Sequence, residues 1–345
     1  MIDQLLDDAF LTAAEDAVRA AAAAEVMPRW RQLAAHEVTE KSGPHDLVTV
    51  ADRAAEEHLT ASLTALLPGS VVVGEEAVHA DPRVYEAVRG DTYVWIVDPV
   101  DGTRQFVHGD PGFCTLVALA RHGELLASWT FAPAKDEMAV AVRGRGARLN
   151  GAELHAGAPR PDAPLRVATS HPDYTTPDQK RALLGLTTSG VDPRPCGSAG
   201  LAYLAVARGE LDALAFSWEY AWDHAAGLLL LTEAGGAHVT VGGRPFSIPG
   251  GNGLPCAAAG DAVHRPRTPR SGRNTAWHAP HGTHRMPRTD GTQRMARTGQ
   301  VRRGAAWTRR GHGRSSGPPG TGRAAGARSC WPSGRTRCSG SVASS

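Results

Sequence analysis

Two aspartates follow the apolar segment 93–97, within the motif DPVDGT at 98–103. Pro99 lacks a backbone donor and makes the chain turn, so Asp98 and Asp101 can point to one side with the Val100 carbonyl between them. Two carboxylates and a backbone oxygen are hard ligands that suit Mg²⁺. The next N–H groups stand where a helix could begin and would face an anion such as phosphate. Taken alone, the same pattern is also that of an ordinary Asp-rich turn.

Three other segments concentrate acidic residues beside a strand end or a helix start. They are KSGPHDLVTVAD at 41–52, GEE at 74–76 and WDHAAG at 222–227. Two of them have an ordinary interpretation on their own, since GEE is common in solvated loops and Asp223 could simply cap a helix. Their joint occurrence favours a single site to which all four segments contribute. Four carboxylates in one place repel one another, so we expect the site to be inactive and looser without metal.

Taken together, these four motifs resemble the inositol monophosphatase family of metal-dependent, lithium-sensitive phosphatases. The resemblance covers residues 5–260. It implies an α+β fold, an αβαβα layered sandwich, usually a homodimer, that binds two or three Mg²⁺ ions per site between the layers. The implied activity is Mg²⁺-dependent hydrolysis of a small phosphate monoester by a metal-activated water.

The resemblance also implies which residues hold metal. It assigns the first ion to Glu75, Asp98 and the Val100 carbonyl. It assigns the second ion to Asp98, Asp101 and Asp223, and a weaker third ion to Glu75.

Catalytic and phosphate-binding roles are implied in the same way. The resemblance assigns the orientation of the attacking water to Thr103 and Glu75, with Asp52 in support. Phosphate contacts fall to Asp101, Gly102 and Thr103. Three further positions match family motifs without an assigned role: Lys41, Asp46 and Glu76.

The position that would contact the substrate departs from the family. Members that act on inositol phosphate carry a glutamate seven residues before the aspartate of the WD motif, where this chain has Phe216. A phenylalanine ring cannot accept a hydrogen bond from a hydroxyl, although a small shift would bring Glu219 into its place. Ser198 is a second candidate for substrate contact, or else a plain helix cap. Histidinol phosphate, fructose 1,6-bisphosphate and 3′-phosphoadenosine nucleotides therefore stay open as alternative substrates.

The elements that must position these residues follow from periodicity and turn signals. Helical spacing of apolar residues predicts helices over 2–35, 51–67, 198–207 and 222–234. Apolar runs bounded by turn residues predict strands over 70–74, 93–97, 113–121, 124–131, 138–142, 147–149, 165–170 and 211–216. Asn150-Gly151 predicts a hairpin turn. Helices and strands thus alternate to about residue 260, as the layered fold requires.

The charge of the chain changes sharply after this alternation stops. Residues 1–264 carry 20 basic and 34 acidic side chains, whereas 265–345 contain seventeen arginines, no lysine and Asp290 as the sole acid. We predict a phosphatase domain over 1–262 and a basic, Arg/Gly/Pro-rich disordered tail over 263–345. Arginine without lysine is typical of a GC-rich gene read out of frame, so we hypothesise that the tail is a frameshift product. The rival interpretation is a nucleic-acid-binding arm, which we favour less because the arginines form no dense cluster.

Composition and motifs argue against several other classes of protein. The five cysteines include no CxxC pair, as a zinc ribbon would require. HExxH and GxxxxGK[ST] motifs are absent from the sequence. The acidic start lacks the pattern of a signal peptide, and no apolar run reaches the about 20 residues of a membrane span. We expect a cytoplasmic protein without membrane contact whose partner is a small phosphorylated metabolite.

Overall fold

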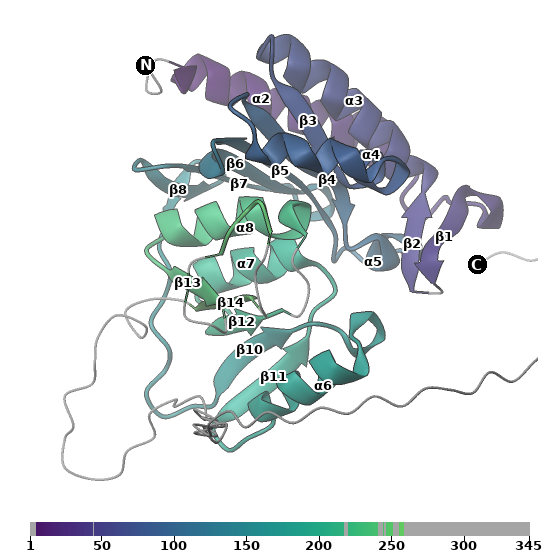
Figure 1. The fold of residues 1–345 in the computed structure, drawn as a ribbon. Coiled ribbons are helices and arrows are strands. Elements are labelled where there is room, and N and C mark those ends of the chain that lie inside the picture. Colours follow the sequence, from purple (N-terminus) through teal and green to yellow (C-terminus); the bar gives the residue numbers. More distant parts are fainter. Residues whose placement is uncertain are drawn as a thin grey trace, which may run out of the picture. The chain divides into compact units, whose positions relative to one another are not determined.

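The computed structural model describes residues 5–43, 45–216, 220–240, 244, 246–250 and 255–258 (Figure 1). The predicted tail at 263–345, and with it the predicted boundary at 262, lies outside the described residues. Among the helices that the structure describes, none is both long and apolar enough to cross a membrane.

A seven-stranded sheet of small and β-branched residues carries the first part of the fold (Figure 1). Its strands follow in the order β3 (Val71–Gly74), β4 (Val94–Asp101), β5 (Cys114–Arg121), β6 (Glu124–Ala132), β7 (Glu137–Val142), β8 (Gly146–Leu149) and β9 (Ala152–Leu154). β3 pairs with β4 in parallel, and every later pair is antiparallel. Asn150 and Gly151 both have positive φ between β8 and β9, so the predicted hairpin turn is confirmed.

Two helices, α2 (Asp8–Ala21) and α3 (Val50–Leu66), cover one face of this sheet (Figure 1). Their buried apolar side chains, such as Leu59, share a cluster with Trp95 of β4 and Trp129 of β6. The two tryptophan rings lie 5.9 Å apart, measured between centroids. This cluster fixes α3 against the strand that ends in the acidic motif.

The sequence predicted one of these two helices correctly. The helix expected over 51–67 is confirmed. The helix expected over 2–35 is confirmed only over 8–26, because α2 begins after its N-cap Asp7, passes into a π-helical turn at Ala22–Val26, and the chain then leaves the helix. Pro28 lacks the N–H that a continuing helix would need.

Two further helices, α7 (Ala199–Ala207) and α8 (Ala221–Glu233), cover the opposite face of the sheet (Figure 1). Both consist largely of Ala, Gly and Leu and are buried over most of their length. A Cβ at Gly227 of α8 would lie 2.2 Å from the ring of Tyr203 in α7. The close approach of these helices therefore depends on a residue without a side chain.

A second sheet lies on the far side of α7 and α8 (Figure 1). Its order is β11 (Val191–Pro195), β10 (Leu165–Thr169), β12 (Ala213–Ala215), β14 (Pro255–Ala258) and β13 (Ala237–Thr240). Leu214 of β12 shares a buried cluster with Tyr203 of α7. Helix α6 (Pro177–Leu183) flanks this sheet in Figure 1, which completes the predicted αβαβα sandwich.

Several strands of the second sheet escaped sequence-based prediction. β11 contains Pro193 and Pro195, and it pairs only with β10, as the edge strand of its sheet. An edge strand tolerates proline because its outer N–H groups need no partner in the sheet. The strand predicted over 211–216 is shorter, at 213–215.

Short elements lead into the acidic motifs. β1 (Val38–Gly43) and β2 (Asp46–Thr49) form a separate antiparallel ribbon. Helix α4 (Glu75–Ala80) begins directly after β3, and α5 (Thr103–Val107) begins two residues after β4. The GEE and DPVDGT motifs therefore both stand at junctions between a strand and a helix.

The contact between α7 and α8 predicts the effect of one added methyl group. Because the Cβ of Gly227→Ala would collide with Tyr203, we expect this variant to lower the free energy of unfolding by about 1–3 kcal/mol. Urea denaturation followed by circular dichroism measures the loss. Gly185→Ala is the control, since no heavy atom lies within 4 Å of a Cβ built there. Equal stability of the two variants would contradict the expectation.

Candidate active site

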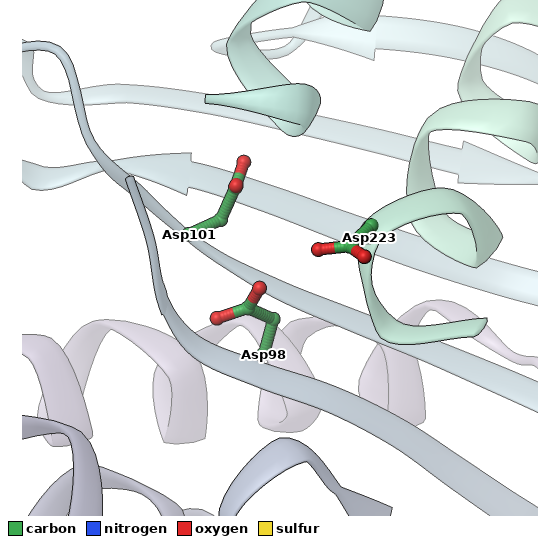
Figure 2. Close-up of side chains that lie close together, drawn as sticks. All are labelled: Asp98, Asp101 and Asp223. Carbon is green, nitrogen blue, oxygen red and sulfur yellow. The ribbon is translucent and has the colours of Figure 1, made fainter. Parts of the chain in front are cut away.

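A β-bulge at the end of β4 positions the first two carboxylates. Asp98 pairs with Leu116 of β5, whereas Asp101 pairs with Cys114, so β4 contains one extra residue in this interval. Residues three apart in a regular strand point to opposite faces, and one extra residue returns them to the same face. The strand thus continues through Pro99 to Asp101, and the prediction that it ends at Val97 is wrong. The prediction that both carboxylates point to one side is confirmed (Figure 2).

The third carboxylate comes from the first turn of α8. Asp223 approaches the two strand aspartates from the other side of the site (Figure 2). One oxygen from each of Asp98, Asp101 and Asp223 lies within 4.8 Å of the other two. Tyr220, not Asp223, occupies the N-cap position, so the ordinary interpretation of Asp223 as a cap is wrong. Three carboxylate oxygens at this spacing suit a hard divalent cation such as Mg²⁺.

Asp101 is held by the start of α7. Its Oδ2 accepts hydrogen bonds from Ser198 Oγ and from the Gly200 N–H, both at 2.6 Å. Its Oδ1 accepts from the Ala199 N–H at 3.1 Å. This carboxylate therefore joins the seven-stranded sheet to the helix layer.

Thr103 and Asp52, the pair predicted to orient and support the attacking water, are hydrogen-bonded to each other. Thr103 Oγ1 lies 3.1 Å from Asp52 Oδ1 and 3.0 Å from the Val100 carbonyl oxygen, and it can donate a hydrogen bond to either. Asp52 is fully buried, and its Oδ2 accepts from the N–H and the hydroxyl of Thr49 at 2.8 and 2.5 Å. Because its hydrogen is engaged, the Thr103 oxygen is free to accept a hydrogen bond from a bound water.

Lys41 supplies a cation at the edge of the acidic site. Its Nζ donates to Glu75 Oε1 at 2.7 Å and also to Glu76 Oε1. The side chain of Lys41 is 4% exposed. Burial opposes its charge, but the two glutamates outweigh burial and raise the pKa of Lys41. Lys41 and Glu76, which the sequence left without a role, thus form an ion-pair cluster with the predicted ligand Glu75.

The described site contains more negative charge than one lysine neutralises. Burial, followed by the neighbouring carboxylates, raises the pKa of Asp98 well above its usual range. Burial also raises the pKa of Asp101, although hydrogen bonds from the start of α7 oppose the shift. Burial raises the pKa of Glu75 in spite of Lys41. A bound divalent cation would favour the ionised forms, so the donor set fits a metal ion.

Gly102 allows the chain to turn from the bulge into α5. Its φ is +91°, in the left-handed region that favours glycine. A Cβ at this position would also lie 2.9 Å from the Gly112 carbonyl oxygen. The glycine of DPVDGT is therefore required by both conformation and space.

Three positions bear on substrate contact: Phe216, which replaces the family's glutamate, and the two candidates Glu219 and Ser198. Phe216 is fully buried and packs against Tyr203 and His224, so its ring belongs to the core. Glu219 lies outside the described residues. Ser198 caps α7, accepting from the Leu201 N–H at 3.2 Å, and donates to Asp101. Its predicted alternative role as a helix cap is confirmed.

Glu56 is a buried acid that sequence reasoning missed. It stands four residues after Asp52 in α3 and is 6% exposed. Residues four apart share one face of a helix, so this spacing could have identified Glu56 once Asp52 was placed at the site. Its oxygens accept from backbone N–H groups at the start of α4.

Comparison with known proteins gives the same assignment as the fold and the site. The family model described as "Inositol monophosphatase family" matches residues 7–271. The inositol-1-monophosphatase of Rhizobium meliloti (strain 1021) is 37% identical over 239 residues, which are 65% of this chain and 85% of that protein. The "Nus factor SuhB" of Pseudomonas aeruginosa is 35% identical over 204 residues, which are 55% of this chain and 71% of that protein.

Solved structures agree with these sequence relatives. The extragenic suppressor protein suhB from Bartonella henselae superposes with a TM-score of 0.62 and 27% identity, over 74% of this chain and 95% of that chain. The chain therefore belongs to the inositol monophosphatase family, whose members are metal-dependent phosphoric monoester hydrolases.

The raised pKa values predict that the metal-free protein loses stability as the pH rises. Burial raises the pKa of Asp52 from 3.8 to about 7 and that of Glu56 from 4.5 to about 7. The folded state therefore retains both protons above pH 4.5, and this stabilisation is lost as the pH rises through about 7. In EDTA we expect a Tm at pH 8 that is about 5 °C or more below the Tm at pH 5.5, measured by circular dichroism.

Two comparisons control this experiment. Saturating Mg²⁺ should remove most of the difference, because a cation favours ionised carboxylates. Asp52→Asn should reduce the pH dependence in EDTA. A metal-free Tm that rises with pH over this interval would contradict the expectation.

Proposed function

We propose that this chain hydrolyses a small phosphate monoester, of the inositol monophosphate type, in a Mg²⁺-dependent reaction that uses water as the nucleophile. The observation that carries the proposal is the convergence of Asp98, Asp101 and Asp223 within 4.8 Å, beside the hydrogen-bonded pair of Thr103 and Asp52. Membership of the family supports the reaction class.

The metal ligands are proposed as the resemblance assigns them. Glu75, Asp98 and the Val100 carbonyl would hold one ion, Asp98, Asp101 and Asp223 a second, and Glu75 a weaker third. When bound, Mg²⁺ would polarise the phosphate oxygens and lower the pKa of a coordinated water. Asp98 is 2% exposed and lies beside both other aspartates, which supports its role as a metal ligand.

The protein's own groups would orient the attacking water. Thr103 Oγ1 would accept a hydrogen bond from this water while its hydroxyl donates to Asp52 Oδ1 or to the Val100 carbonyl oxygen. Glu75 would help to orient the same water. The Gly102 and Thr103 N–H groups would face the phosphate, and Asp101 would stay in position through its bonds to α7.

Fewer described residues are available to contact the substrate's leaving group than its phosphate. Phe216 is buried in the core and offers no acceptor, so the hydroxyls of an inositol ring would need Glu219 or Ser198. Relatives named inositol-1-monophosphatase support inositol monophosphate as the first substrate to test. Histidinol phosphate, fructose 1,6-bisphosphate and 3′-phosphoadenosine nucleotides remain the alternatives. The predicted homodimer and cytoplasmic location are kept as parts of the proposal.

A second candidate function is nucleic-acid binding through residues 263–345. The seventeen arginines favour it. Deletion of residues 265–345 separates the two functions, because a phosphatase keeps its Mg²⁺-dependent turnover whereas a binder loses its salt-sensitive affinity for nucleic acid.

Substitution of the shared ligand tests the proposed reaction. We expect Asp98→Asn to lower Mg²⁺-dependent phosphate release by about 100-fold or more, because the variant loses a charged ligand of both ions. Release is measured over the panel of inositol 1-phosphate and the three alternatives, and the wild type should favour one of them. Asp162→Asn, at an exposed position, is the matched control and should leave the rate unchanged. Release that survives EDTA, or survives in Asp98→Asn, would overturn the proposal.

A pair of variants at Thr103 tests the orientation of water. Thr103→Ala should lower kcat by about 100-fold, whereas Thr103→Ser retains the hydroxyl and most of the rate. The Mg²⁺ concentration for half-maximal activity should change little in either variant. Equal turnover in the two variants would show that the hydroxyl plays no part.

A further inference from the structure

Two buried carboxylates on one face of α3, Asp52 and Glu56, contact two different helices near the site. Asp52 reaches Thr103 at the start of α5, and Glu56 reaches the start of α4. The Thr103 contact belongs to the water-orienting pair described above. The Glu56 contact has no part in that chemistry, since its oxygens face backbone N–H groups and not the carboxylate cluster.

Both carboxylate oxygens of Glu56 accept hydrogen bonds from the first turn of α4. Oε2 accepts from the Glu76 N–H and Oε1 from the Ala77 N–H, each at 2.8 Å. These donors belong to the first turn of α4, whose N–H groups have no partner within the helix. The N-cap residue is Gly74, which has no side chain to satisfy them. Glu56 therefore takes the place of an N-cap side chain from a different helix.

Gly74 makes room for this arrangement. A Cβ at Gly74 would lie 2.2 Å from the Cδ of Glu56 and 2.4–2.5 Å from its two oxygens. The φ of Gly74 is −101°, a value that any residue adopts, so space and not conformation requires a glycine here. The glycine of GEE and the buried Glu56 thus form one matched contact.

The contact between Glu56 and α4 fixes the helical turn that carries the predicted metal ligand Glu75. Glu75 and Glu76 are the first two residues of α4, and Lys41 joins their side chains. The direction of both carboxylates depends on where this first turn lies. Placing a third acid beside them is electrostatically unfavourable. An apolar residue at this position would avoid that cost but could not fix the position of the turn.

We infer that Glu56 is a positioning residue for metal binding: by fixing the first turn of α4, it holds Glu75 in the direction that a cation requires. The inference rests on the proposed function, because it takes Glu75 as a ligand. Groups that orient a ligand without touching the metal typically change metal affinity by about 10–100-fold when substituted.

Calorimetric titration of the full chain with Mg²⁺ tests the inference. Glu56→Gln keeps the size of the side chain but turns an NH₂ group toward one of the two N–H donors. We expect this variant to bind Mg²⁺ about tenfold more weakly and to need about tenfold more Mg²⁺ for half-maximal phosphate release. Its kcat at saturating Mg²⁺ should return to within about threefold of wild type, because the residues that contact water and phosphate are intact.

Neighbouring variants provide the controls. Glu57→Gln makes the same chemical change at the adjacent, exposed position of α3 and should bind Mg²⁺ as wild type does. Gly74→Ala keeps the glutamate, but its Cβ would occupy the space of the Glu56 carboxylate, so this variant should show the same loss of Mg²⁺ affinity. It replaces Glu56→Gln as the test if that variant does not fold.

The outcomes separate this inference from the proposed function. A folded Glu56→Gln that binds Mg²⁺ as tightly as wild type would overturn the inference alone. A lower kcat at saturating Mg²⁺ with unchanged affinity would also overturn it, since that pattern shows a role in the reaction step. A wild-type protein that does not bind Mg²⁺ would overturn the proposed function, and the inference with it.

Discussion

Asp98 and Asp101 are buried and Asp223 is partly buried, so little water screens the repulsion between these three aspartates, whose oxygens lie within 4.8 Å of one another. Most of the local structure opposes that repulsion. The bulge in β4 brings Asp98 and Asp101 to one side, and the start of α7 holds Asp101 with three hydrogen bonds. Asp223 comes from α8, in a separate layer. The site thus exists because the layers are packed together and not because one loop carries the acids.

The repulsion among these acids explains why so many groups around the site donate hydrogen bonds or form ion pairs to carboxylates. Lys41 lies between two glutamates, Thr49 donates twice to Asp52, and backbone N–H groups of α4 hold Glu56. Each contact compensates an acid that burial disfavours in its charged form. The fold therefore carries an electrostatic repulsion that a bound divalent cation would relieve, and such binding would raise the stability of the fold.

The local chemistry of the site was readable from sequence, but its contacts between distant segments were not. DPVDGT predicts two carboxylates on one side because proline and glycine fix the local backbone. The grip of Glu56 on α4, and the ion pairs of Lys41, depend on tertiary packing that no local pattern records. Predicted elements failed for similar reasons: the first helix ends in a π-helical turn before Pro28, and β11 carries prolines that only an edge position tolerates.

Diffraction from crystals of the full chain soaked in Mn²⁺ tests most directly whether these carboxylates form a metal centre. Mn²⁺ prefers the same oxygen ligands as Mg²⁺ and scatters anomalously. The predicted result is an anomalous peak within bonding distance of Asp98, Asp101 and Asp223, which disappears in Asp98→Asn. An empty carboxylate cluster at saturating Mn²⁺, or a peak bound only elsewhere, would contradict the assignment of this site.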